Sequence, residues 1–410
     1  MPARSTDLSA GTPLVVAGLR TPLARAGTQL AGEPAHRLAA SVLGALVRRC
    51  GVGRDALADV VLGNAVGGGG NVARLAALEA GLPDALPGLT VDRQCGSGLD
   101  AIVLACRLAA AEPGRAYLAG GVESISTAPV RGRRGPDGAV EFFARAQHAP
   151  SRPGEDEPGD PDMGFAAETV AREACVSRAR QDAFALRSHR RALKAIATGA
   201  FDDELVPLHT AEGWVRADNG PRPRLDGRLL ARFPGAFAAG GTVTAGNSCF
   251  DADGAAAVLI VSPGGSLPVP PLTEKERPRM GLAFRGAATV GVDPRRLGLG
   301  AAAAAERLFA DQGVGLRDLA ALEFNEAFAG QVLACLDRLG ADDEFVESVL
   351  NTDGGALALG HAYGASGAVS VVRLMARAQS LPEGALCAAM VSSAGGIGTA
   401  ALFEACRLPS

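Results

Sequence analysis

The sequence GVGRDALADVVLGNAV, Gly51–Val66, aligns without gaps with GVGLRDLAALEFNEAF, Gly313–Phe328. A second pair follows in the same order, because SGLDAIVLACRLAA from Ser97 resembles SGAVSVVRLMARA from Ser366. Each copy combines a short apolar run, typical of a buried strand, with an amphipathic helical pattern that starts at a Ser-Gly pair. We interpret the chain as two halves that repeat one order of elements; chance similarity in an Ala-rich chain is the alternative.

Outside the repeat, further apolar runs alternate with helical patterns, which predicts an α/β protein with mainly parallel strand pairing. The pattern breaks between about Ser124 and Gly241 in segments rich in Gly, Pro and charge, which we interpret as an insertion in the first half. The predicted strands are Pro13–Gly18, Val60–Gly63, Ala116–Ala119, Ala255–Val261, Leu322–Phe324 and Ala385–Val391, and the clearest helices are Ala35–Cys50, Ser177–Gly199 and Ala301–Gln312.

Composition excludes several classes of function. With 410 residues, 48% of them apolar, the chain can build a core for two fused domains. A net charge of −4 does not favour nucleic acid or an anionic membrane as partner. No apolar run is long enough to span a bilayer, and no signal segment is visible. The eight cysteines and five histidines do not cluster as metal ligands. We therefore expect a reduced, cytoplasmic enzyme without a metal.

One cysteine stands where a nucleophile would be expected. In DRQCGSGLDA, Asp92–Ala101, Cys95 precedes a Gly-Ser-Gly turn and a predicted helix. Unpaired N–H groups at a helix N-terminus favour a thiolate and can hold the oxyanion of a thioester under attack. The alternative is a small buried apolar residue, which is our interpretation of Cys106, Cys175, Cys335 and Cys406.

A histidine occupies the corresponding loop of the second half. GGALALGHAYGASG, Gly354–Gly367, places His361 just before the second Ser-Gly helix. If the two halves are related by symmetry, this loop meets the Cys95 loop and brings an imidazole to the thiol, a common way to activate sulfur. A structural histidine is the alternative.

Two further segments lie at predicted strand ends, where α/β sheets build their sites. NEAFAG, Asn325–Gly330, ends the repeated strand, although Asn is also a frequent helix cap. SSAGGIG, Ser392–Gly398, follows the last strand, and its glycines allow close backbone approach to a ligand or simply form a turn.

Together these blocks resemble the thiolase family over nearly the whole chain. The resemblance implies duplicated βαβαβαββ halves in a five-layer α-β-α-β-α arrangement. It places the N-terminal half at residues 1–123 and 242–268, an inserted loop domain at 124–241 and the C-terminal half at 269–410. The matching blocks, in the family's order, are LRTPLARAG, VVLGNAV, DRQCGSGLDA, GGVESIS, MGFAAE, GTVTAGNSCFDADGAAA, EFNEAFA, GGALALGHAYGASG and SSAGGIGTAALFE.

The resemblance implies catalytic roles residue by residue. Cys95 matches the nucleophile that takes the acyl group, and His361 matches the base that activates it and helps to hold a thioester oxygen. Asn325 matches the residue that fixes a water in that oxyanion hole. The backbone N–H groups of Cys95 and Ala394 match a second hole.

Substrate contacts follow from the same resemblance. Met163 and Phe328 match residues of the acyl and pantetheine site, and Arg222 falls where the loop domain offers an Arg to the nucleotide end of coenzyme A. No cofactor is expected to stay bound, because coenzyme A thioesters are the substrates. We expect a homo-oligomer, with the choice between dimer and tetramer depending on the loop near Val130–Asp162.

Three blocks depart from the family pattern. The family's CxGGGxG block has its second catalytic Cys where this chain has Ser392, and a hydroxyl is a poor base near neutral pH. The family's AGNASG reads AGNSCF, so Cys249 and Phe250 replace a pantetheine-contacting Ser and a Gly. The usual GHP reads His361, Ala362, Tyr363.

Three functions therefore stay open. The first is a thiolase-type acyltransferase that performs Claisen condensation or thiolytic cleavage of a 3-ketoacyl-CoA, with Ser392 as a weakened acid/base. The second is a decarboxylating condensing enzyme or simple acyltransferase, which would need only Cys95, His361 and Asn325; its donor could be an acyl carrier protein. The third is a weakly active acyl-CoA-binding subunit of a complex.

Overall fold

The computed structural model describes residues 11–143, 145–151, 159–262 and 280–408. The repeat is visible in it at the level of single residues. Leu57 begins strand β3 (Leu57–Gly63), and the equivalent Leu319 begins β12 (Leu319–Phe324). Each strand directly follows a 3₁₀ turn, Arg54–Ala56 in one half and Leu316–Asp318 in the other. Equivalent sequences therefore fold into equivalent elements.

One ten-stranded sheet runs through both halves. Its order is β12, β13, β14, β11, β1, β10, β5, β3, β4, with the short β2 beside β10. The halves join where Leu14 of β1 pairs antiparallel with Ala283 of β11. The bounds are β1 Leu14–Arg20, β2 Ala24–Arg25, β4 Gly88–Val91, β5 Ala116–Glu123, β10 Ala252–Val261, β11 Met280–Gly291, β13 Leu386–Ser393 and β14 Ile397–Arg407.

The prediction of mainly parallel pairing is wrong. β3 pairs parallel with β4 and β5, and β12 with β13. β10 pairs antiparallel with β1 and β5, and β14 pairs antiparallel with β11 and β13. The alternation of strands and helices concealed the antiparallel strands, because β13 returns into β14 through the three-residue turn Ala394–Gly396, which leaves no room for a helix.

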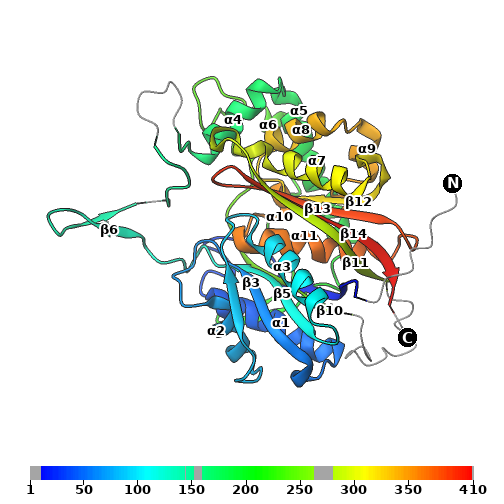
Figure 1. Ribbon diagram of the computed structural model, residues 1–410. Helices are drawn as coiled ribbons and strands as arrows, with labels where there is room; N and C mark the ends of the chain where they lie inside the picture. Colours follow the sequence, from blue (N-terminus) through cyan, green and yellow to red (C-terminus); the bar gives the residue numbers. More distant parts are fainter. Residues whose placement is uncertain (1–10, 144, 152–158, 263–279, 409–410) are drawn as a thin grey trace.

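The layered α/β prediction is confirmed by the packing, which Figure 1 shows edge-on. Helices α1 (Ala35–Cys50) and α2 (Val72–Glu79) cover one outer face through one hydrophobic cluster. Helices α3 (Ser97–Ala111) and α11 (Tyr363–Ala378) lie between the two halves of the sheet in a second cluster. Helices α7 (Gly300–Gln312) and α8 (Ala329–Leu339) cover the other outer face through a third.

Residues 124–251 leave the sheet at β5 and return at β10, two strands that pair with Glu123 opposite Gly254. The predicted domain limits stay a prediction, and those at residues 1, 268, 269 and 410 lie outside the described residues. The segment holds α4 (Met163–Glu173), α5 (Arg178–Ala197), α6 (Gly227–Leu230) and the hairpins β6 (Gly132–Arg134) with β7 (Val140–Phe142) and β8 (Leu208–Thr210) with β9 (Gly213–Val215).

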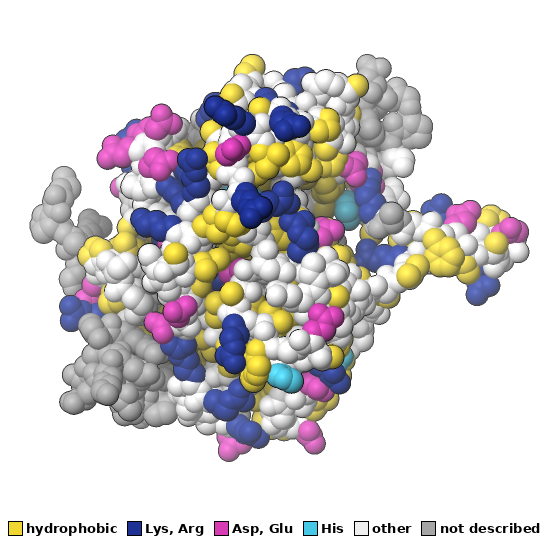
Figure 2. Space-filling model, turned by 180° about the vertical axis from the view of Figure 1, so that it is seen from behind, with side chains coloured by type: hydrophobic (Ala, Val, Ile, Leu, Met, Phe, Trp, Pro, Cys, Tyr) yellow, Lys and Arg dark blue, Asp and Glu magenta, His cyan; other side chains and the backbone are white. Residues whose placement is uncertain are grey.

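The β6–β7 hairpin projects well beyond the body of the protein (Figures 1 and 2). Several of its large apolar side chains are exposed, with Val130 at 82% and Phe142 at 73%. Within the described ranges, no helix has the length and apolar character needed to cross a membrane. The remaining short elements are the 3₁₀ helix η3 (Pro294–Leu299), α9 (Asp343–Ser348) and α10 (Ala356–Leu359).

Candidate active site

The two central helices touch backbone to backbone at their N-terminal turns. A Cβ added at Gly98 of α3 would lie 2.6 Å from the Gly364 carbonyl oxygen, and one added at Gly367 of α11 would lie 2.6 Å from the Leu99 nitrogen. Only glycine allows this approach. Cys95 and His361 each stand two residues before the first residue of their helix. The crossing therefore brings both loops to one region.

The Cys95 loop is held rigidly by its own neighbours. Gln94 adopts a left-handed φ of 53°, and its N–H donates to Asp92 Oδ1 at 2.9 Å. The Ser97 hydroxyl accepts from the Arg93 N–H at 2.7 Å and donates to the Gln94 carbonyl at 2.6 Å. These bonds turn the chain into α3 and fix Cys95 immediately ahead of the helix.

The environment of Cys95 corrects the expectation of a helix-stabilised thiolate. Burial raises the pKa of the Cys95 thiol to about 12, although N–H groups of Ala394 and of Cys95 itself act in the opposite direction, and the charge of Glu123 raises it further. Desolvation outweighs the helix terminus here. The thiol is therefore neutral and needs a base to become a nucleophile.

His361 has the properties of that base. It is buried, and desolvation lowers its pKa to about 4, so the ring is neutral near pH 7. Its Nδ1 lies 2.6 Å from Ser366 Oγ, which donates to the Ala362 carbonyl at 3.1 Å. Because the hydroxyl has one proton to donate, it accepts from Nδ1–H, and this leaves the lone pair on Nε2. His361 Nε2 is buried without a hydrogen-bond partner.

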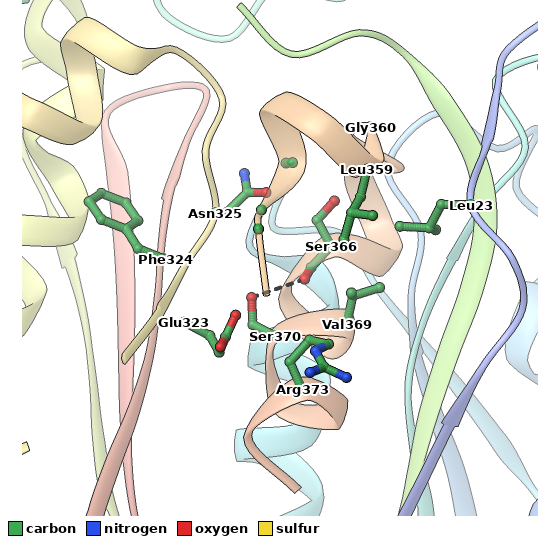
Figure 3. A pocket seen from close by; sticks show the side chains of 13 residues that line it. Leu23, Glu323, Phe324, Asn325, Leu359, Gly360, Ser366, Val369, Ser370 and Arg373 are labelled. Carbon is green, nitrogen blue, oxygen red and sulfur yellow. Dashed lines mark hydrogen bonds between the residues drawn. The ribbon is translucent and has the colours of Figure 1, made fainter. Parts of the chain in front are cut away.

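Asn325 directly follows the end of β12. Its N–H donates to the Met390 carbonyl at 3.1 Å, while its side-chain Nδ2 is buried without a partner. Figure 3 shows Asn325 and Ser366 lining one narrow pocket, together with Glu323, Ser370 and Arg373. An unsatisfied amide donor in such a pocket can polarise an oxygen atom, directly or through water.

The turn between β13 and β14 supplies backbone donors. Gly395 and Gly396 have φ angles of 79° and 76°, and a Cβ at Gly396 would lie 2.3 Å from the Val292 carbonyl oxygen. Only glycine tolerates both the positive φ angle and the close contact that leaves no space for a Cβ atom. The turn directs the Ala394 N–H to the Cys95 sulfur, as its effect on that pKa shows. The arrangement can thus stabilise a developing oxyanion at a carbonyl attacked by Cys95.

Comparison with known proteins identifies the family. The thiolase N-terminal domain matches residues 14–264, and the thiolase C-terminal domain matches residues 280–405. The chain belongs to the thiolase family.

Relatives at high identity carry related names. The chain is 42% identical over 365 residues to the Staphylococcus haemolyticus protein named "Putative acetyl-CoA C-acetyltransferase VraB", covering 86% of this chain and 88% of that one. It is 40% identical over 374 residues to the Bacillus subtilis protein "Putative acetyl-CoA C-acetyltransferase YhfS", covering 90% and 92%. The crystal structure of the Bacillus anthracis acetyl-CoA acetyltransferase superposes with a TM-score of 0.82 at 32% identity, covering 96% and 98%.

Within this thiolase, Ser392 faces away from the Cys95 loop. Its hydroxyl donates to the Gly298 carbonyl at 2.7 Å and accepts from the Ala301 N–H at 2.9 Å and from Gln331 Nε2 at 3.3 Å. The neighbouring Ser393 lies beside that loop, since a Cβ at Gly96 would be 2.9 Å from Ser393 Oγ. Residues alternate between the two faces of a strand, which explains the difference.

The residues expected to contact substrate form two regions. One is an aromatic wall that includes Phe328, and the other is a basic region at Arg222, called the basic end below. Met163 begins α4, and the ring of Phe237 fills the space above Gly164, where an added Cβ would meet it at 2.1 Å. Phe237 packs edge-on against Phe328 with ring centres 6.0 Å apart. Phe237 could not be predicted as part of this wall, because it comes from a loop without a motif.

The basic end combines Arg222 with Arg25. Arg25 lies 3.8 Å from the ring centre of Phe250, and its pKa is lowered by burial and by the charge of Arg222. His189 Nδ1 accepts from the Arg222 N–H at 3.2 Å. Burial lowers the pKa of His189 to about 4, and the charges of Arg222 and Arg25 add to this effect. Arg25 lies within the block LRTPLARAG, but no role was predicted for it from the sequence.

Cys249, Phe250 and Tyr363 border the catalytic loops. The Tyr363 hydroxyl donates to Asp251 Oδ1 at 2.5 Å, and its ring meets the His361 ring edge-on at 5.0 Å. Phe250 packs against Gly360, where an added Cβ would lie 2.6 Å from its ring. Two departures from the family pattern, Phe250 and Tyr363, therefore lie next to His361, whereas Ser392 is bound to Gly298.

Two other expectations about single residues differ from the structure. Cys175 is exposed and not a buried apolar residue, because it follows the end of α4 in a left-handed conformation with φ 54°. Glu123 was not singled out, yet its buried carboxylate accepts from the N–H groups of Ala65, Val66 and Gly364. Burial raises the pKa of Glu123 to about 7. It ties the N-terminus of α11 to the first half.

Proposed function

We propose that the chain is a thiolase-type acyltransferase that forms an acyl-Cys95 thioester from an acyl-CoA. It then carries out Claisen condensation, or the reverse thiolytic cleavage of a 3-ketoacyl-CoA. The observation that carries this proposal is the convergence of a neutral Cys95 thiol, the Ala394 N–H and a neutral His361 at the crossing of α3 and α11. The names of the relatives, acetyl-CoA C-acetyltransferases, support acetyl-CoA as acyl donor.

In the first step, His361 Nε2 takes the thiol proton while the sulfur attacks the thioester carbonyl. Nε2 carries a lone pair, and the pKa of the ring is low. His361 therefore suits a base that takes the proton only while the bond between the Cys95 sulfur and the carbonyl carbon forms. The N–H groups of Cys95 and Ala394 would hold the oxyanion of this step. The free Nδ2 of Asn325 would hold the thioester oxygen of the second substrate, with His361.

The substrate would lie between α4 and the catalytic loops. Met163, Phe237 and Phe328 provide an apolar wall for the acyl and pantetheine groups. Arg222 and Arg25, whose charges act on each other, suit the phosphates of coenzyme A. No further cofactor takes part in this scheme, because the thioester is itself the activated group.

A decarboxylating condensing enzyme is the second candidate. The Ser392 hydroxyl is engaged with Gly298, Ala301 and Gln331, so the family's second acid/base has no counterpart at that position. Loss of carbon dioxide from a malonyl thioester would generate the carbanion without a base. Product formed from malonyl-CoA plus acetyl-CoA, with none from acetyl-CoA alone, would favour this candidate.

The test of the first candidate is thiolysis of acetoacetyl-CoA by free coenzyme A, followed by loss of absorbance of the 3-ketoacyl thioester. We expect turnover in the wild type, none in Cys95→Ala, and a decrease of ~10²–10⁴-fold in His361→Ala, the usual contribution of a general base. Wild-type protein that cleaves neither acetoacetyl-CoA nor longer 3-ketoacyl-CoAs would overturn the proposal and favour an acyl-CoA-binding subunit.

A further inference from the structure

The structure raises the question of which group transfers the second proton. Ser392 occupies the expected position, but its hydroxyl already donates to Gly298 and accepts from Ala301 and Gln331. A hydroxyl has one proton and two lone pairs, so its bonding capacity is filled by the protein. Ser392 thus fastens the start of α7 to β13. Ser393 lies on the other face, beside Gly96, but its hydroxyl is as poor a base near neutral pH as that of Ser392.

The cysteines point to another group. All eight lie within the described residues and none forms a disulfide; Cys50, Cys106, Cys335, Cys387 and Cys406 are buried. Of the other three, Cys175 is exposed beyond the end of α4, whereas Cys95 and Cys249 are half-buried. A half-buried thiol is not part of the packed core, and it is not fully exposed to solvent either. Cys249 shares this state with the nucleophile.

The backbone around Cys249 runs between the two loops that carry Asn325 and His361. The Cys249 N–H donates to the Ala327 carbonyl at 2.9 Å, and the Ala327 N–H donates to the Asn325 carbonyl at 3.1 Å. On the other side, the His361 N–H donates to the Phe250 carbonyl at 2.8 Å. Cys249 is therefore fixed within a few residues of both groups.

The ionisable side chains around Cys249 influence one another's pKa values. Burial raises the pKa of the Cys249 thiol, and the charge of Cys95 is the next largest contribution. Cys95 and Cys249 both help to raise the pKa of Tyr363, after burial and the contact with Asp251. The ring of Tyr363 rests on His361. Tyr363 links the segment of Cys249 to the imidazole, because its ring contacts His361 and its hydroxyl donates to Asp251, two residues after Cys249.

We propose that Cys249 is the second acid/base of the reaction, in the role that Ser392 cannot fill. This inference rests on the proposed function, because it assigns a proton transfer within that reaction. It explains how a thiolase without a Cys at position 392 retains a sulfur acid/base next to the nucleophile.

The proton transfers balance over one condensation. His361 takes the proton of Cys95, the bond from Cys95 Sγ to the acyl carbon forms, and the bond from that carbon to the CoA sulfur breaks. The departing CoA thiolate takes the proton of Cys249. The Cys249 thiolate then removes a proton from the methyl group of a second acetyl-CoA, whose carbanion attacks acyl-Cys95. The Cys95 sulfur leaves and recovers its proton from His361.

The test separates the two half-reactions in Cys249→Ser, with Cys175→Ser as the matched control. Acetylation of Cys95 is followed by intact mass, and condensation of the acetyl-enzyme with acetyl-CoA is followed in a single turnover. We expect Cys249→Ser to be acetylated, which also shows that it is folded, and to condense ~10²–10⁴-fold more slowly than wild type. Cys175→Ser is expected to match wild type in both steps.

The alternative role, a mere contact to pantetheine, predicts a different result. It would raise the KM for acetyl-CoA and leave the rate at saturation unchanged. That outcome, or condensation in Cys249→Ser within about threefold of wild type, where acid–base loss costs far more, overturns the inference alone. A wild type that is acetylated but does not condense overturns the proposed function together with it.

Discussion

At the scale of single residues, the mechanism we propose starts from two neutral groups and not from a preformed ion pair. Burial raises the pKa of Cys95 and lowers that of His361, so desolvation favours the uncharged form of both. Proton transfer must then accompany attack. Ser366 determines which nitrogen of His361 is free, and it acts without touching the substrate.

A pH profile tests this pairing. His361 must be neutral to act, and its pKa is lowered to about 4, so activity should be lost only as pH falls through about 4. The rate of Cys95 acetylation, measured by quenched mass spectrometry from pH 4.5 upward, should therefore show no inflection near the ordinary histidine pKa of about 6.5. A clear decrease in rate below pH 6.5 would show that His361 is not desolvated as described.

The Ser366 contact predicts a measurable positioning effect. Ser366→Ala removes the acceptor of Nδ1–H and releases the ring, while Ser370→Ala, one turn further along α11, is the control. A hydrogen bond contributes about 0.5–1.5 kcal/mol, so we expect acetylation to slow roughly 2- to 12-fold with an unchanged KM. Equal rates in both variants would remove Ser366 from the account.

At the scale of elements, the site exists because α3 and α11 approach without side chains between them. Gly98 and Gly367 make that contact symmetrically, each against the backbone of the other helix. The N-terminal turns, and with them Cys95 and His361, are thereby held at one point. The repeat in the sequence is the signature of this symmetric contact.

Gly98→Ala should separate the two helices. The added Cβ would meet the Gly364 carbonyl at 2.6 Å, and overpacking of this kind typically costs ~1–3 kcal/mol. In the control Gly44→Ala within α1, the new Cβ meets only the end of the flexible Arg48 side chain, so stability should rise by roughly 0.5–1 kcal/mol. Urea unfolding of both variants, with the acetylation rate, measures the contrast; destabilisation of equal size in both would contradict it.

At the scale of the whole molecule, we propose that two exposed surfaces mediate the association between copies that the sequence led us to expect. Strand β4 forms one edge of the sheet, with Leu89 40% exposed and the α2 residues Leu75 and Leu78 exposed beside it. Unpaired sheet edges readily pair with another chain. The β6–β7 hairpin projects from the body (Figure 2), and its residues Val140 and Phe142 are exposed.

If the two surfaces act independently, the formation of the dimer and the formation of the tetramer can be disrupted separately. We expect a tetramer in sedimentation velocity for the wild type, and a dimer for a variant with Val140→Ser and Phe142→Glu, because exposed apolar patches of this kind mark interaction sites. A variant with Leu75→Glu and Leu89→Glu should weaken the dimer itself. A wild-type monomer at micromolar concentration would contradict the proposal.

The sequence predicted those features that depend on local residue patterns. The limits of α1 and the positions of Cys95 and His361 ahead of their helices follow from periodicity and the repeat. β3 and β12 were predicted with their correct ends but begin three residues earlier than predicted, at the equivalent Leu57 and Leu319. The antiparallel pairing of β13 with β14, the partners of Ser392 and the contact of Phe237 with Phe328 depend on tertiary packing. The raised pKa of Cys95 likewise reflects burial, which outweighed the local helix terminus.

The most direct test of the central claim is the intact mass of the protein after incubation with acetyl-CoA. We predict a single added acetyl group in the wild type, located on Cys95 by peptide mapping and absent from Cys95→Ala, with Cys249→Ser still acetylated. An adduct that persists in Cys95→Ala, or its absence from the wild type with acetyl-CoA and longer acyl-CoAs alike, would contradict the assignment of Cys95 as the acyl-accepting nucleophile.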